Sequence, residues 1–147
     1  MKTKRATTDD LQVLTGLFDQ YMVFYKKPSA PTQYGAYLKE RLENNEAIVF
    51  LALDNTGKAL GFVLNYFSFT SVSQGKIVVL NDLFVAPSHR KKGVGEHLIQ
   101  CSFDLAKSMG AVRVDLGTAK DNYDAQRLYE RIGFIRDDEF YAYSYSI

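Results

Sequence analysis

One stretch in the middle of the chain, residues 76–109, restricts the possible folds more than any other. Residues 76–85 are rich in β-branched side chains and predict a β-strand, which ends before Pro87. A basic, glycine-containing segment follows. Residues 93–109 then carry apolar side chains at helical spacing, up to a stop at Gly110. The chain therefore contains a strand, a loop and an amphipathic helix in direct succession.

The rest of the chain alternates between helical and extended periodicity. Helical spacing runs over residues 9–25 and about 32–44, and it returns over 123–132. Shorter apolar or alternating runs predict further strands at 47–53, 59–69, 112–116 and 140–145. The order of elements predicts a mixed α/β or α+β sheet. A length of 147 residues fits one domain that spans 1–147.

Composition excludes several classes of protein. Lysine and arginine number 18 against 17 acidic residues, so the net charge of +1 does not favour binding to nucleic acid or an anionic membrane. The single cysteine, Cys101, excludes an internal disulfide and a multi-cysteine zinc site, and no metal is expected. No apolar run approaches the ~18 residues of a membrane span, and the N-terminus lacks a signal peptide. We therefore expect a cytoplasmic protein.

The basic loop has the composition of an anion-binding site. Arg90, Lys91 and Lys92 supply positive charge immediately before a helix, whose first N–H groups lack intrahelical partners. Gly93 and Gly95 remove side chains that would keep an anion away from those donors. The sequence therefore predicts a phosphate or pyrophosphate site. The alternative is a tight turn in which the glycines serve only the backbone and the basic residues face water.

A second segment with candidate chemistry lies one strand and one helix further on. Asn122 stands at the start of a predicted helix, where its amide can cap the helix or bind a ligand amide. Tyr129 follows two helical turns later on about the same face. Its phenol can donate a proton to a leaving thiolate. The alternative for Tyr129 is a packed core aromatic.

Together the two segments resemble the GNAT superfamily of acetyl-CoA-dependent N-acetyltransferases. The spacing Arg90-x-x-Gly93-x-Gly95 fits the family's pyrophosphate loop. Its second signature is matched in order and spacing by Asn122, Ala125, Tyr129 and Gly133-Phe134. Within the superfamily, residues 61–69 and 81–85 look most like diamine (spermidine/spermine) acetyltransferases and small fungal histone/polyamine acetyltransferases.

The resemblance implies a central mixed, mostly antiparallel sheet flanked by helices, with acetyl-CoA as cosubstrate. It implies these cofactor-binding residues: Phe84, Val85, Arg90, Lys91, Lys92, Gly93, Val94, Gly95, Glu96 and Asn122. Tyr129 would be the catalytic residue that protonates the sulfur of CoA. In this fold the two N-terminal helices border the acceptor, so the resemblance also implies an aromatic wall there, although most of the aromatics in these helices are expected to be packing residues. They are Phe18, Tyr21, Phe24, Tyr25, Tyr34 and Tyr37.

The resemblance implies acetyl transfer to a primary amine of a small molecule, polyamine or amino-acid-like, by direct attack in a ternary complex. One residue departs from the diamine enzymes: Asn81 stands where they carry a glutamate thought to deprotonate the amine. Asp82 is adjacent, but neighbouring strand residues point to opposite faces. Two other functions stay open, acetylation of a protein lysine or N-terminus, and a non-catalytic acyl-CoA-binding module. A homodimer is expected from the family.

Overall fold

The computed structural model describes residues 1–147, and backbone contacts divide the chain into two compact units, Met1–Gly117 and Thr118–Ile147. The first unit contains these strands and helices: β1 (Lys2–Arg5), α1 (Leu11–Phe24), α2 (Pro31–Glu43), β2 (Ile48–Leu53), β3 (Ala59–Thr70), β4 (Gly75–Val85), α3 (Val94–Met109) and β5 (Arg113–Asp115). Two short 3-10 helices, Thr8–Asp10 and Pro87–His89, precede α1 and the loop before α3. The second unit contains α4 (Tyr123–Ile132).

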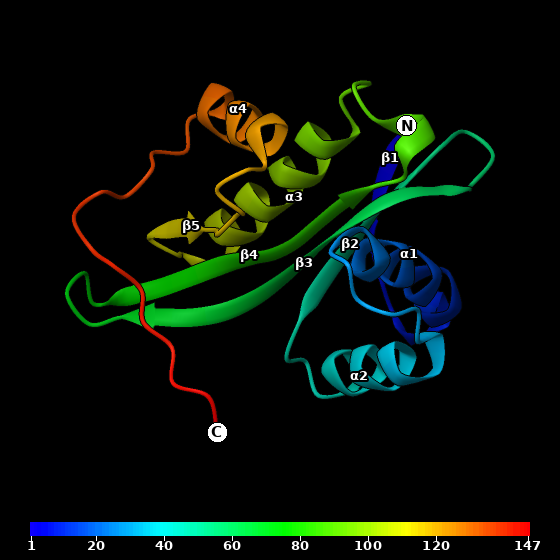
Figure 1. The fold of residues 1–147 in the computed structure, drawn as a ribbon, viewed down its shortest axis with the longest axis horizontal. Helices are drawn as coiled ribbons and strands as arrows, with labels where there is room; N and C mark the ends of the chain where they lie inside the picture. Colours follow the sequence, from blue (N-terminus) through cyan, green and yellow to red (C-terminus); the bar gives the residue numbers. More distant parts are fainter. The chain divides into compact units, whose positions relative to one another are not determined.

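The five strands form one sheet in the order β1-β2-β3-β4-β5 (Figure 1). The pairings from β1 to β4 are antiparallel, and β5 runs parallel to β4. The predicted α/β fold with a mixed, mostly antiparallel sheet is therefore confirmed. Apart from β1 and the C-terminal strand, the predicted elements agree with the observed ones to within two residues at each end.

The helices of the first unit cover both faces of its sheet. α1 and α2 lie on one face and α3 on the other (Figure 1). Leu64 of β3 belongs to the core under α1 and α2. The next residue, Asn65, points to the opposite face, where its side chain bonds Ser102 of α3. This alternation along β3 is what gives the strand two buried faces.

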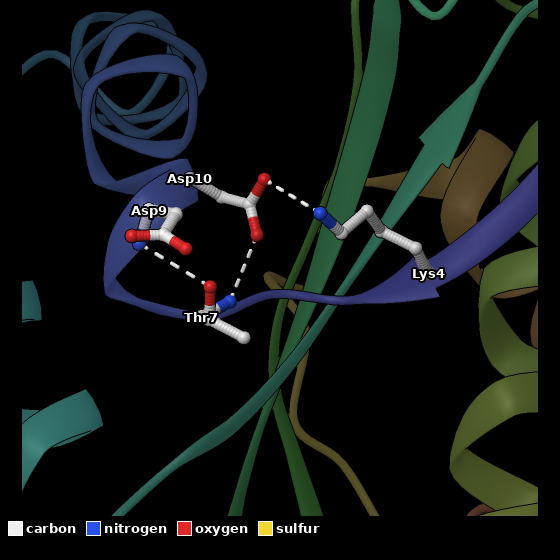
Figure 2. Close-up of polar contacts among 4 residues, drawn as sticks. All are labelled: Lys4, Thr7, Asp9 and Asp10. Atoms are coloured by element: carbon white, nitrogen blue, oxygen red, sulfur yellow. Dashed lines mark hydrogen bonds and ion pairs between the residues drawn. The ribbon is translucent and has the colours of Figure 1, made fainter.

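β1 is a strand that the sequence pattern does not predict, because its four residues are polar and exposed. Its connection to α1 is fixed by a capping box at Thr7 (Figure 2). The Thr7 hydroxyl accepts from the N–H of Asp9 at 3.2 Å, and the Thr7 N–H donates to the Asp10 carboxylate at 2.8 Å. Lys4 of β1 donates to the other oxygen of Asp10 at 3.0 Å. The cap therefore ties the edge strand to the start of α1.

The second unit begins with a capped helix and ends without regular structure. Asn122 caps α4, and Gly133 ends it, as predicted. The predicted strand at 140–145 is wrong, because residues 134–147 form neither helix nor strand. The side chains of Tyr141, Tyr143 and Tyr145 are about nine-tenths exposed. Alternation indicates only that a segment suits a sheet, and a strand also needs a neighbour to bond its backbone.

None of the helices combines the length and the apolar character that crossing a membrane would require.

Candidate active site

The loop between β4 and α3 holds two residues in the left-handed backbone region. Lys91 has a φ of 61° and Gly93 a φ of 82°. The first bond of α3 runs from the N–H of His97 to the carbonyl of Gly93 at 3.1 Å. The N–H groups of Val94 and Gly95 precede it and have no partner within the helix. The loop therefore presents backbone donors at the positive end of the helix dipole, as an anion site requires.

Three side chains hold this loop in place. Arg90 donates from Nε to the carbonyl of Val85 at 2.8 Å, and its guanidinium stacks on the rings of Phe24 and Phe84. Lys92 donates from Nζ to the carbonyl of Ser88 at 3.2 Å. Nδ1 of His97 lies 2.9 Å from the Gly93 carbonyl, which can only accept, so the ring nitrogen carries the hydrogen. Arg90 thus anchors the loop to β4 and to the aromatic core.

The predicted cofactor residues in this region present different groups to the surface. The side chains of Phe84 and Val94 are 5% and 4% exposed, so these residues offer a ligand only their backbone. Lys91 and Lys92 are exposed and offer their charges. Glu96 lies in the first turn of α3 and is also exposed. A ligand at this loop would therefore meet backbone N–H groups and lysine side chains.

One edge of β4 is open along its second half. β5 pairs with β4 only from Ile77 to Val79, so no strand follows the β5 side of β4 from residue 80 to Val85. On the other side, β3 approaches closely: a Cβ on Gly61 would lie 2.4 Å from the carbonyl oxygen of Phe84. The glycine allows this close pairing. The unpaired edge ends at the loop that carries Arg90.

A β-bulge lies where this open edge begins. Leu64 of β3 pairs with Asp82 and the next residue, Asn65, pairs with Leu80, so Asn81 is the extra residue on β4. A bulge changes the direction in which the flanking side chains point. Asn81 is exposed, and its amide donates to the carboxylate of Asp82 at 3.2 Å. The two side chains therefore meet, although they are neighbours along a strand.

Asp82 is a buried carboxylate bonded through a single oxygen. Its side chain is 8% exposed, and Oδ1 accepts from the Tyr21 hydroxyl at 2.7 Å as well as from Asn81. Burial raises the pKa of the Asp82 carboxyl, and the hydrogen bonds from Tyr21 and Asn81 oppose that rise. Asp82 is therefore a stronger base than an exposed aspartate.

Two tyrosines form a second polar pair near this carboxylate. The hydroxyls of Tyr37 on α2 and Tyr66 on β3 lie 2.5 Å apart, and the guanidinium of Arg41 lies 4.7 Å from the centre of the Tyr37 ring. Burial, the bond to Tyr37 and the charge of Asp82 raise the pKa of the Tyr66 hydroxyl. The Tyr66 hydroxyl therefore stays protonated at neutral pH and can donate.

The predicted aromatic wall is partly core. Phe18 and Tyr34 are 6% and 8% exposed and pack in the core under α1 and α2. Phe24, Tyr25 and Tyr37 are between 40% and 54% exposed. Tyr21 joins the two groups, because its ring contacts the core and its hydroxyl bonds Asp82. The exposed members are the ones that a ligand could contact.

The remaining predicted site residues lie in the second unit. Asn122 caps α4 by accepting from the N–H of Ala125 at 3.4 Å. Tyr129 is half-buried on the same helix, and its ring packs edge-on against Phe134 with centroids 5.8 Å apart. The predicted site thus draws residues from both units, and the proximity of Tyr129 to the β4 edge stays a prediction.

The structure contains no group of three or more histidine, cysteine, aspartate or glutamate side chains that could hold a metal ion. Cys101 is a free, half-buried thiol.

The Tyr21–Asp82 hydrogen bond is the main feature of the site that sequence reasoning missed. The two residues are 61 positions apart in the chain. The polar pair Asn81-Asp82 inside an apolar strand was the available signal. A buried carboxylate is rare and costly unless it is paired or hydrogen-bonded, so a partner for Asp82 could have been expected. The bulge that turns Asp82 toward α1 has no glycine or proline to mark it.

Comparison with known proteins agrees with this geometry. The model of the Acetyltransferase (GNAT) family matches residues 14–134. YhfO, an uncharacterized N-acetyltransferase of Bacillus subtilis (strain 168), is 39% identical over 147 residues, which are 100% of this chain and 98% of that protein. D-amino-acid N-acetyltransferase HPA3 of Saccharomyces cerevisiae is 29% identical over 136 residues, 90% of this chain and 83% of that one.

Solved structures show the same relationship. The crystal structure of a probable acetyltransferase, 38% identical, superposes with a TM-score of 0.94 and covers 100% of this chain and 98% of its own. The family model spans both the loop at Arg90 and the helix that carries Asn122 and Tyr129. The chain therefore belongs to the GNAT acetyltransferase family and is an acetyl-CoA-dependent N-acetyltransferase.

Proposed function

We propose that this enzyme transfers the acetyl group of acetyl-CoA to a primary amine of a small molecule, by direct attack within a ternary complex. The observation that carries the proposal is the open edge of β4, which runs from the bulge at Asn81 to the loop at Arg90. A backbone edge of this kind can pair with the amide groups of a pantetheine arm, as it would with another strand.

The loop beyond that edge suits the pyrophosphate of CoA. The N–H groups of the first turn of α3 supply directional donors, and Lys91 and Lys92 supply exposed charge. Gly93 adds no side chain of its own over those donors, and His97 Nδ1 would lie 3.9 Å from a Cβ built there. Arg90 would act on the anion through the position of the loop, because its guanidinium is engaged with Val85 and two aromatic rings.

The reaction needs four further contributions. An N–H group near Phe84 or Val85 would stabilise the oxyanion that forms when the amine attacks the thioester. Asn122 would bond the pantetheine chain, and Tyr129 would protonate the sulfur as thiolate leaves. These two roles rest on the resemblance of the α4 segment to the family signature. Binding both substrates together supplies the proximity that makes a covalent enzyme intermediate unnecessary.

The acceptor is proposed to be a small polar amine of the polyamine or amino-acid type. The relative HPA3 bears the name of a D-amino-acid N-acetyltransferase, which makes free amino acids the first candidates. The exposed aromatic rings of Tyr25 and Tyr37 would provide the wall of the acceptor site. The second candidate is the lysine or N-terminus of a protein, which an open and partly exposed acceptor region would also admit.

A screen for release of free CoA tests the proposal. The protein is mixed with acetyl-CoA and with D- and L-amino acids, spermidine, or lysine and N-terminal peptides, and the free thiol is titrated. We expect release with a small amine and saturation by both substrates. Release with the peptides alone would select the protein acceptor. Binding of acetyl-CoA without release in any arm would contradict the proposal.

Closeness to the polyamine acetyltransferases, a single domain over residues 1–147, a homodimer and a cytoplasmic location remain predictions. A free thiol at Cys101 fits a reducing compartment. Light scattering tests the dimer, and a mass equal to one chain at all concentrations would contradict it. Relative rates with spermidine and with D-amino acids test the polyamine specificity.

A further inference from the structure

We propose that the Asp82 carboxylate binds the ammonium group of the acceptor and accepts its proton, with Tyr21 and Asn81 as positioning residues. The inference rests on the proposed function. It assigns the proton acceptor to the residue next to Asn81, and it makes the substrate an amine that arrives protonated.

The first argument is that Asp82 has no counter-ion. The carboxylate is 8% exposed, and none of the ion pairs in the structure includes it. A buried charge without a cation is costly, and an asparagine or leucine would fill the same space at lower cost. A cation from outside the protein would supply the missing partner. An alkylammonium group has the charge and the three N–H donors to do so.

The second argument is the way the carboxylate is held. Tyr21 of α1 and Asn81 of the bulge both donate to Oδ1, at 2.7 and 3.2 Å. These two bonds fix one oxygen from different elements and so fix the orientation of the group. The other oxygen, Oδ2, has no hydrogen bond in the structure. The side chain keeps 8% of its surface exposed, and both of its hydrogen bonds end on Oδ1. Oδ2 is therefore the oxygen that an amine can approach.

The third argument is the surroundings of the carboxylate. Phe84 lies two residues beyond Asp82 on the same face of β4, before the loop that carries Arg90. The ring of Tyr21 packs against the ring of Phe84. Tyr66 of β3 adds a hydroxyl with a raised pKa, which is hydrogen-bonded to the hydroxyl of Tyr37. The guanidinium of Arg41 lies over the Tyr37 ring. The titratable groups around Asp82 are thus the phenols of Tyr21 and Tyr66. A site of neutral donors and aromatic rings around one carboxylate suits an ammonium ion.

The same contacts explain how the proton can move. Burial disfavours the charged carboxylate, so the pKa of Asp82 lies above its ordinary value. The ammonium gives one proton to Oδ2, and the neutral nitrogen then forms a bond to the thioester carbon while the C–S bond breaks. The nitrogen loses a second proton after attack. One proton ends on the sulfur of CoA and one returns to solvent, so each turnover releases one proton.

The test is a pH profile of the Asp82→Asn variant with the amine that gives the fastest CoA release. At neutral pH we expect kcat/KM to fall about 100-fold or more, as for loss of a general base. The variant can react only with amine that is already neutral in solution. Since that neutral fraction rises about tenfold per pH unit, kcat/KM of the variant should rise equally, up to the pKa of the amine itself. The exposed Asp104→Asn on α3 is the matched control and should behave as wild type.

Each outcome decides a different point. An equal loss at every pH, or no loss, would overturn the role of Asp82 while leaving the proposed function in place. Absence of CoA release by the wild-type enzyme with every amine would overturn the proposed function, and this inference with it. A thermal shift with acetyl-CoA shows that Asp82→Asn is folded. If Asp82→Asn does not fold, Tyr21→Phe is the second variant. Loss of the Tyr21 hydroxyl removes a hydrogen bond to the Asp82 carboxylate and so raises the pKa of Asp82. The acidic side of the kcat/KM profile should then move to higher pH.

Discussion

The hydroxyl of Ser102 on α3 donates to Oδ1 of Asn65 on β3 at 2.8 Å, and both side chains are fully buried. The amide nitrogen of Asn65 donates in turn to the carbonyl of Ile48 on β2 at 3.1 Å. Asn65 is also the residue at which the pairing of β3 and β4 shifts register. The helix that begins at the basic loop is therefore attached to the strand beside the bulge.

Replacing Ser102 by alanine should destabilise the fold. The change leaves the buried oxygen of Asn65 without its donor, and we expect a loss of about 1–3 kcal/mol in the free energy of unfolding. Urea denaturation followed by circular dichroism measures it. Ser108→Ala on the same helix is the control, because that hydroxyl is exposed and bonds a carbonyl within the helix. Equal effects of the two variants would contradict a specific role for the Ser102–Asn65 bond.

Replacing Tyr129 by phenylalanine should lower turnover and leave acetyl-CoA affinity nearly unchanged. The variant keeps the ring that packs on Phe134 and removes only the hydroxyl. Loss of a general acid lowers kcat by about 10²–10⁴-fold. Steady-state kinetics gives kcat, and calorimetry gives the Kd of acetyl-CoA. Unchanged turnover would remove Tyr129 from the mechanism.

The sequence predicts the elements whose signals are local. Gly110 and Gly133 end their helices where expected, and the basic loop lies between β4 and α3. Each of these features depends on a few neighbouring residues, so spacing is sufficient to find it.

Features that depend on distant partners escape this reasoning. β1 is recognised only through its pairing with β2, and the expected strand at 140–145 lacks such a neighbour in its own unit. Strand alternation sends adjacent residues to opposite faces, so the sequence leaves open whether Asp82 can act in place of Asn81. The bulge at Asn81 interrupts the alternation of side chains along β4. This bulge arises from the pairing of β4 with β3, and no residue type in the sequence marks it.

Replacing Gly93 by alanine should weaken acetyl-CoA binding and destabilise the protein. At a φ of 82° an L-residue is strained, which costs about 1–2 kcal/mol. The strain would move the loop whose N–H groups are proposed to hold the pyrophosphate. Gly16→Ala is the control, since Gly16 lies within α1 and a Cβ there meets nothing within 4 Å.

The Gly16→Ala variant should gain about 0.5–1 kcal/mol in stability from higher helix propensity, with acetyl-CoA affinity unchanged. Urea denaturation and calorimetry measure both quantities in both variants. An acetyl-CoA affinity in Gly93→Ala equal to that of Gly16→Ala would show that the loop conformation is not needed for binding.

The stability of the protein should depend on pH through Asp82 in the direction opposite to that of a salt-bridged aspartate. Its pKa is raised in the folded state because burial disfavours the charged form. Between the unfolded and the folded pKa, the folded state therefore binds more protons than the unfolded state. Stability falls as pH rises through this window, and the full penalty is present above the folded pKa.

Asp82→Asn removes this titration while it keeps an oxygen that Tyr21 and Asn81 can bond. We expect the variant to gain stability relative to wild type as pH rises from about 4 to 8, and to be the more stable of the two at neutral pH, although it has lost activity. Thermal unfolding of both proteins across that range measures the difference. A difference that is constant with pH, or that favours the wild type increasingly at high pH, would show that the carboxylate is stabilised in the fold.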